Sequence, residues 1–372
     1  MIDIPVIRSW IILNMKKIII CFDGTGNEPK DAEQKISSNG KLKDNNISNV
    51  LKLHLLSGGN IENTSNHFTD QVSFYYSGVG TRGNFLRRLV KKAIALDAPQ
   101  KIMKEAQRDI EKKYRKNDSL YIFGFSRGAA IARMFASNLY KYGLQDTDGE
   151  LDSNPKIEML GVWDTVASFG KLNIISKNRP ISDVIFEDNR ISPAIRNAYH
   201  LVSIDENRLA FRPTLMNHQD NIQEVWFPGV HSNIGGGYKQ SGLSDITLDF
   251  MLNAGKNHDL EFLSVKDIPN NNLQGIDQHG DMITIDRDDI LYSPNSKGKL
   301  HKHKEFWRKG IKKFIMAPRD VVVVKNNIVS NQLPIVHYSA IERMNHKRKY
   351  KPYSLLDEDY LILDEHGNIQ SK

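Results

Sequence analysis

The chain has 372 residues, of which 40% are hydrophobic and 26% are charged, and its formal net charge is +7. This length and composition predict a globular protein with one large buried core, and the single cysteine excludes an intramolecular disulfide framework. No stretch approaches the roughly twenty apolar residues that a membrane span needs. Residues 1–15 form an N-terminal extension without the features of a signal peptide, so we expect cytoplasmic synthesis, with Met15 as an alternative start.

The first predicted core element is a strand at residues 16–22, whose unbroken apolar run at residues 18–22 is typical of a parallel strand buried on both faces. The Asp-Gly-Thr-Gly-Asn segment that follows could bring backbone N–H groups close to a substrate oxygen. Gly24 or Thr25 is therefore a candidate donor to an oxyanion. The competing prediction is a phosphate loop of the dehalogenase type, which requires an aspartate nucleophile at the position of Cys21. We therefore disfavour phosphatase chemistry.

The next elements are predicted helices separated by a long polar loop. Residues 28–66 are rich in Asn, Ser, Lys and Gly and contain one short helix at 47–56. Residues 85–97 are basic and apolar with helical spacing, and residues 101–115 form the helix that leads into the next strand.

The most informative motif is Gly124-Phe125-Ser126-Arg127-Gly128, a complete G-x-S-x-G sequence between an apolar strand at residues 120–123 and an alanine-rich helix start. In this setting the motif predicts a nucleophile elbow, a tight turn that exposes the serine hydroxyl at the carboxyl end of the strand. Glycines two residues before and after the serine avoid collisions with the neighbouring strand and helix. Ser126 is the predicted nucleophile, and the N–H group of Arg127 is a predicted oxyanion donor.

A serine nucleophile requires a histidine base and an acid that orients the histidine. Asp164 follows the apolar strand at residues 157–162 and is the predicted acid, although an aspartate there could instead cap a helix. Asp205 is the rival acid, but residues 198–207 have the pattern of a helix with a polar face. His231 follows the strand at residues 222–227 in a glycine-rich loop and is the predicted base.

Several further histidines lack such a position after a strand and are interpreted as structural or solvated: His200, His218, His258, His301 and His303. Residues 171–195, between the acid and histidine strands, could supply a lid or pocket wall.

Several motifs in order resemble those of the type VI secretion lipase-effector-like (Tle-type phospholipase) α/β-hydrolase family. They are IICFDGTGN (19–27), NISNVLKL (46–53), YYSGVGT (75–81), FGFSRGAA (123–130), GVWDTVAS (161–168), AYHLVSIDENRLAFRPTL (198–215) and WFPGVHSNIGGGY (226–238). The resemblance implies a serine hydrolase acting on ester bonds, with phospholipase activity in effector members, and implies Ser126, Asp164 and His231 as its triad. One departure is Asn233, where the family usually has aspartate.

The C-terminal third carries fewer of these motifs. We expect residues 16–260 to form the catalytic domain and residues 261–372 to form an extension packed on the same domain, with a C-terminal helix at 335–344. Residues 297–319 contain nine Lys or Arg against the single acid Glu305, interleaved with aromatic residues. On a helix, Trp307, Ile311, Phe314 and Ile315 would share a face. Such a helix would either pack on the core or lie on an anionic membrane surface.

The sequence therefore predicts an α/β-hydrolase-like, doubly wound and mostly parallel sheet with a nucleophile elbow. The predicted activity is hydrolysis of carboxylic esters, of lipids in particular, without a metal or organic cofactor. The alternative is a binding protein of the same fold without catalysis or with a different specificity. We expect a lipid or other ester substrate, no nucleic-acid partner, and an immunity or delivery protein together with type VI export if the chain is an effector.

Overall fold

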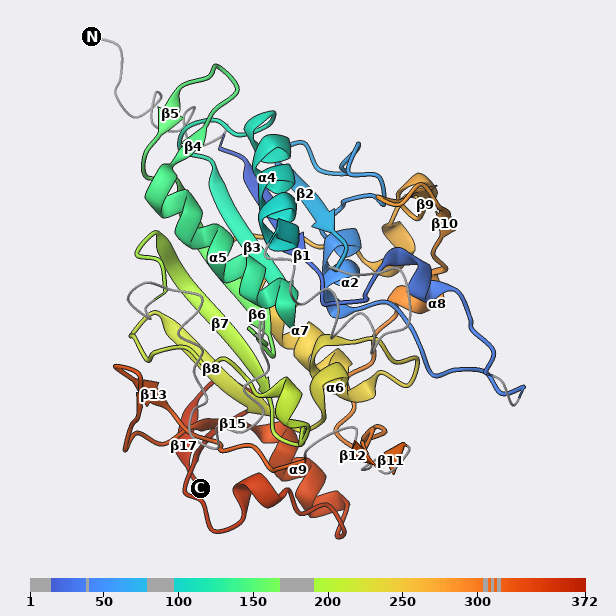
Figure 1. Ribbon diagram of the computed structural model, residues 1–372, viewed down its shortest axis with the longest axis vertical. Coiled ribbons are helices and arrows are strands. Elements are labelled where there is room, and N and C mark those ends of the chain that lie inside the picture. Colours follow the sequence, from blue (N-terminus) through green and yellow to red (C-terminus); the bar gives the residue numbers. More distant parts are fainter. Residues whose placement is uncertain are drawn as a thin grey trace.

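The computed structural model describes residues 15–37, 40–78, 97–167, 191–303, 307–308, 311–312 and 316–372. These residues include a nine-stranded sheet with the order β17-β16-β15-β8-β7-β6-β3-β1-β2 (Figure 1). Its strands are β1 (Lys17–Phe22), β2 (Gln71–Tyr76), β3 (Ser119–Phe125), β6 (Lys156–Trp163), β7 (Ile195–Ser203), β8 (Ile222–Phe227), β15 (Ile335–His337), β16 (Leu361–Leu363) and β17 (Ile369–Ser371). Within this described sheet, only the pairing of β16 with β17 is antiparallel. The predicted α/β-hydrolase-like, mostly parallel sheet is confirmed.

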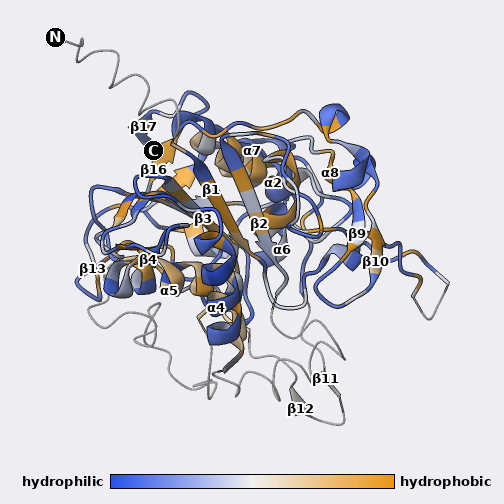
Figure 2. Ribbon diagram, turned by 90° about the horizontal axis from the view of Figure 1, so that it is seen from above, coloured by the Kyte–Doolittle hydropathy of each residue, from blue (hydrophilic) through white to orange (hydrophobic). Residues whose placement is uncertain are grey.

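Helices cover both faces of this sheet, as Figure 2 shows. One layer contains α4 (Asp97–Glu111) and α5 (Arg127–Tyr142), and the other contains α2 (Asn49–Leu56), α6 (His231–Gly235) and α7 (Gly242–Asn257). The alternation of side chains along β1 explains the two layers, because successive residues of a strand point to opposite faces. Ile18, Ile20 and Phe22 pack in the core on the α4 and α5 side, and Ile19 and Cys21 pack in the core with α2 and α7.

The other elements in the described ranges are short. They are α8 (Arg287–Ile290), α9 (Tyr338–His346), five single 3-10 turns among the described residues, and the two-stranded pairs β4 (Leu144–Gln145) with β5 (Leu151–Asp152), β9 (Gln274–Ile276) with β10 (Met282–Thr284), β11 (Trp307–Arg308) with β12 (Ile311–Lys312), and β13 (Val324–Lys325) with β14 (Ile328–Val329).

The predicted helices at 47–56 and 101–115 correspond to α2 and α4. The predicted helix at 198–207 is wrong, because this segment contains most of β7. The last four residues of β7 are all buried, so the strand lacks the alternation of a half-buried strand. The spacing of its polar residues therefore matched the pattern of an amphipathic helix.

Two C-terminal expectations also change. The helix expected at 335–344 begins only at Tyr338, since Ile335–His337 is strand β15 of the main sheet. The helical face proposed for residues 307–315 is wrong where the structure describes it, because Trp307 pairs with Lys312 and Arg308 pairs with Ile311 in antiparallel strands. Pairs with only two residues between them have the spacing of a β-hairpin. The expectations for residues 1–14, for most of 85–97 and for most of 171–195 lie outside the described residues.

Candidate active site

The elbow forms where β3 ends and α5 begins. Ser126 lies between them with φ 58° and ψ −120°, a backbone conformation that residues other than glycine rarely adopt. A Cβ on Gly124 would lie 2.6 Å from the carbonyl oxygen of Gly128, and a Cβ on Gly128 would lie 2.2 Å from the carbonyl oxygen of Phe22. Both glycines are therefore required by close backbone approach, to α5 in one case and to β1 in the other.

His231 is the first residue of the short helix α6, which follows β8. Its Nε2 atom lies 2.8 Å from Oγ of Ser126. The imidazole ring contacts the rings of Phe125 and Phe211, with centroid distances of 4.6 Å and 5.0 Å. These two aromatic contacts fix the plane of the ring, so that its Nε2 edge meets the serine.

Asp164 directly follows β6 and has a positive φ of 42°. Its Oδ2 atom lies 2.5 Å from Nδ1 of His231, and its Oδ1 atom accepts the N–H of Ser203 at 3.0 Å. Since β3, β6 and β8 are parallel members of one sheet, their carboxyl ends carry Ser126, Asp164 and His231 at the same edge. The structure thus brings the three predicted residues into one hydrogen-bonded row.

Sequence reasoning missed a fourth residue of this cluster. Arg319 donates from Nη1 to Asp164 Oδ1 at 2.6 Å and from Nη2 to Asp164 Oδ2 at 3.0 Å. It comes from the C-terminal third, where it appeared only as one of nine basic residues in residues 297–319. No motif distinguishes a buried arginine from the solvated lysines near it, so the sequence carried no local signal for this contact.

Burial and neighbouring charges shift the protonation equilibria of Asp164 and His231. Burial alone would raise the pKa of Asp164, but the Arg319 guanidinium and the contact with His231 hold that pKa well below its usual range. Burial lowers the pKa of His231 below its ordinary value, although Asp164 acts in the opposite direction. At neutral pH Asp164 is therefore ionised and His231 is neutral, the state in which an imidazole can accept a proton.

The candidate oxyanion donors lie beside the elbow. The N–H of Gly24 already donates to Asp23 Oδ1 at 2.7 Å. In the described part of the chain, neither the N–H of Thr25 nor that of Arg127 donates a hydrogen bond, and the buried Oγ1 of Thr25 also lacks a partner. A Cβ on Gly24 would lie 2.8 Å from the ring of Phe125, which shows how closely this loop approaches the elbow. Of the two early candidates, the hydrogen bonds favour Thr25.

The rival acid and one other histidine have different partners. Asp205 accepts the N–H of Gly229 and the hydroxyl of Tyr350, both at 2.7 Å, and so fixes the loop before His231. His200 is fully buried, with Nδ1 2.7 Å from Glu224 and Nε2 accepting the N–H of Thr165. Both side chains have structural partners that account for them.

The remaining histidines of that group also have partners, except His218, for which no side-chain contact is described. His258 bonds to Tyr199 and His301 bonds to Asp44, both at 2.9 Å, and His303 lies 3.8 Å from Glu206. Asn233, at the family's aspartate position, accepts the N–H of His301 and bonds to the His301 ring.

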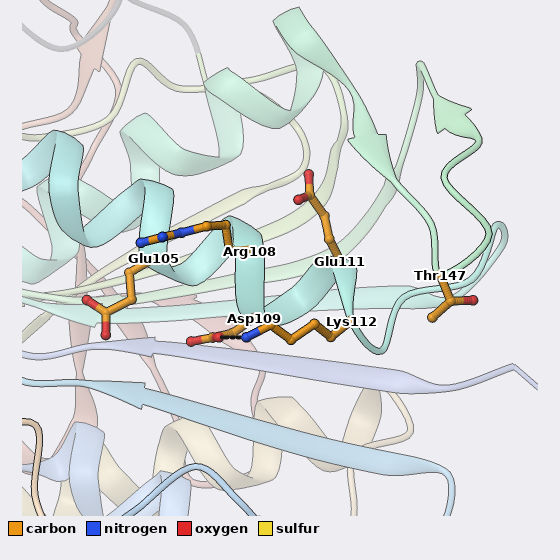
Figure 3. A pocket seen from close by; sticks show the side chains of 6 residues that line it. All are labelled: Glu105, Arg108, Asp109, Glu111, Lys112 and Thr147. Atoms are coloured by element: carbon orange, nitrogen blue, oxygen red, sulfur yellow. Dashed lines mark hydrogen bonds and ion pairs between the residues drawn. The ribbon is translucent and has the colours of Figure 1, made fainter.

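A surface pocket lies away from this cluster. It is lined by Glu105, Arg108, Asp109, Glu111, Lys112 and Thr147 (Figure 3), with Lys112 paired to Asp109 at 2.8 Å. The helix α4 leads to the amino end of β3, and Ser126 follows the carboxyl end. The pocket therefore has no part in the serine site. Among the described residues no group of His, Cys, Asp and Glu is arranged to hold a metal ion, and no helix has the length and apolarity to cross a membrane.

Comparison with known proteins places the chain in a family. Residues 16–153 and 142–254 match the family described as type VI secretion system phospholipase effector Tle1-like, catalytic domain. The uncharacterised protein YEL023C of Saccharomyces cerevisiae is 26% identical over 251 residues, which cover 53% of this chain and 32% of that protein.

Two solved structures are also similar. An uncharacterised protein from Pseudomonas aeruginosa has 21% identity and a TM-score of 0.43, covering 69% of this chain and 48% of the other. The Tle1 effector bound to the VgrG spike of the type VI secretion system has 22% identity and a TM-score of 0.39, covering 60% and 51%. The chain thus spans about a third to a half of the length of these relatives. Because the family match covers more than half of the chain, this protein belongs to the family of Tle1-like phospholipase effector catalytic domains.

Proposed function

We propose that this protein hydrolyses carboxylic ester bonds of phospholipids through an acyl-enzyme on Ser126. The observation that carries the proposal is the unbroken hydrogen-bonded row from Ser126 Oγ through the His231 ring to Asp164. Membership of a phospholipase family supports the ester substrate, and the strained elbow supports the serine as nucleophile.

In the proposed reaction, Ser126 Oγ attacks the ester carbonyl carbon while its proton passes to His231 Nε2. The N–H groups of Arg127 and Thr25 donate to the resulting oxyanion. Collapse of the tetrahedral intermediate breaks the bond to the alcohol, which leaves with the proton from His231. A water molecule then gives a proton to His231 and attacks the acyl group, and the second collapse returns that proton to Ser126 and releases the carboxylic acid. Asp164 stays ionised throughout and stabilises the imidazolium.

The proposed partners follow from the family and the charge. A phospholipid substrate lies in a membrane, whose anionic headgroups attract basic side chains. In the basic segment 297–319, the side chains of Lys297 and Lys302 are exposed. We expect replacement of several lysines of this segment by glutamine to weaken binding to anionic vesicles and to reduce its dependence on salt. Unchanged binding would mean that these charges are only solvated. Export by a type VI system, with a delivery or immunity protein, is part of the same proposal.

The proposal is tested by labelling the full chain with a fluorophosphonate, which only an activated serine captures. We expect wild-type protein and Ser232→Ala to be labelled and Ser126→Ala to remain unlabelled; Ser232 is next to His231 and is a matched control. A phospholipid panel followed by mass spectrometry then gives the headgroup and acyl position. Failure of the wild-type protein to react with the probe and with every lipid would favour a binding protein that lacks catalysis.

A further inference from the structure

The side chain of Arg319 is held on several sides at once. Besides its two bonds to Asp164, its Nη1 donates to the carbonyl oxygen of Ser203 at 2.9 Å and its Nη2 donates to that of Phe211. Only 5% of the residue is exposed, and Asp164 is fully buried. Ser203 ends β7, and Phe211 ends the 3-10 turn Leu209–Phe211 that follows. The main chain at these two positions therefore fixes the guanidinium, and the guanidinium fixes the carboxylate.

The two parallel hydrogen bonds between Arg319 and Asp164 constrain the orientation of the carboxylate as well as its distance. The guanidinium is planar and its two N–H groups bond in parallel to both oxygens of a carboxylate, which sets the plane of the carboxylate. The same Oδ2 atom also receives Nδ1 of His231. The direction in which Asp164 meets the imidazole therefore depends on Arg319.

The charges that surround the acid and base make the electrostatic role of Arg319 distinct. Glu206 accepts the backbone N–H of His231 at 3.2 Å, but Arg208 neutralises it through two bonds of 2.7 Å. His303 lies 3.8 Å from the same glutamate. Arg319 also lowers the pKa of Glu206 from a distance, but the only described carboxylate that it bonds is Asp164, which in turn contacts His231.

We propose that Arg319 is a positioning residue of the hydrolase: it orients the Asp164 carboxylate toward His231 and, through its charge, limits how readily His231 takes up a proton from solvent. The inference rests on the proposed function. It also means that the C-terminal third contributes to the reaction, because Arg319 lies well beyond residues 16–254, which match the family's catalytic domain.

The test uses two substitutions in the full chain that separate charge from hydrogen bonding. Arg319→Gln removes the charge but keeps an amide donor, and Arg319→Lys keeps the charge but loses the planar pair of donors. The pH dependence of kcat/KM for a soluble ester is measured for each. We expect Arg319→Gln to move the midpoint of the acid limb upward by about one pH unit, since the Asp164 carboxylate beside His231 is then no longer paired with a cation and favours the protonated ring more strongly. Arg319→Lys should lower kcat about tenfold or more and leave the midpoint near that of wild type.

Arg343→Met is the matched control. Arg343 is equally buried, also comes from the C-terminal third, and donates to the carbonyl oxygens of Ser296 and Gly298 rather than to the triad. It should leave the midpoint unchanged even if it lowers stability. The inference is overturned if Arg319→Gln keeps the wild-type midpoint, or if Arg343→Met moves it as far. If Arg319→Gln does not fold, the lysine variant decides: a shifted midpoint or an unchanged kcat contradicts the inference. If the wild-type protein shows no ester hydrolysis that depends on Ser126, the proposed function itself is overturned instead.

Discussion

Oδ2 of Asp164 lies 2.5 Å from Nδ1 of His231, whereas the carboxylate of Asp205 bonds to Gly229 and Tyr350. Two aspartates near the same histidine thus have different partners. One contacts the imidazole, and the other fixes the backbone that leads to it.

This difference predicts unequal effects of the same substitution. Asp164→Asn should lower kcat for ester hydrolysis by about 10²- to 10⁴-fold, because the amide cannot stabilise the imidazolium or hold the required tautomer. Asp205→Asn should lower it by less than about tenfold, because an amide oxygen can still accept one of the two bonds. Steady-state kinetics of both variants check this, and a larger loss in Asp205→Asn would reverse the assignment of the acid.

The pH profile follows from the burial of His231. Burial lowers its pKa below the ordinary value of 6.5, and a protonated imidazole cannot accept the proton of Ser126. Protonation therefore sets in only at more acidic pH, and kcat/KM should stay constant at neutral pH and fall with a midpoint below 6.5. An acid limb with its midpoint near pH 7 or above would show that His231 is not the group that titrates.

The positive φ of Ser126 predicts that glycine at this position gives a more stable protein than alanine, although neither variant can hydrolyse esters. Glycine adopts φ 58° without the steric cost that a Cβ imposes. Ser126→Gly should therefore be more stable than Ser126→Ala by about 1 kcal/mol, while both variants lose hydrolysis. Urea unfolding of the two variants measures the difference. Equal midpoints with equal slopes would mean that the elbow stores no strain.

The loop with the candidate oxyanion donors is packed against Gly78. A Cβ at this position would lie 1.7 Å from the carbonyl oxygen of Gly24 and 3.0 Å from the backbone nitrogen of Thr25. Gly78→Ala must displace this loop, so kcat should fall about tenfold or more. The control Gly242→Ala places its Cβ no closer than 3.1 Å to a neighbour and should retain activity. Full activity of Gly78→Ala in a folded protein would remove Thr25 from the oxyanion site.

Much of this arrangement could be predicted from sequence because it depends on local geometry. The elbow requires glycine at positions 124 and 128. The carboxyl ends of parallel strands lie at one edge of a sheet, so Ser126, Asp164 and His231, which each follow such a strand, were predicted to lie together. The roles of these residues remain predictions.

Arg319 could not be predicted, since its partner is 155 positions away and its neighbourhood in sequence is that of a solvated basic segment. Strand β7 was mistaken for a helix because burial on both faces removes the alternation that identifies a strand.

The most direct test of the account is a double-mutant cycle on Ser126 and His231, measured as kcat for a short-chain ester in protein free of contaminating esterase. Ser126→Ala should lower kcat by about 10³-fold or more with the fold intact, and His231→Ala should lower it about as much. The double variant should be little slower than either single variant, because both losses disable the same proton transfer. Near-wild-type hydrolysis by Ser126→Ala, or losses that multiply in the double variant, would contradict the serine mechanism.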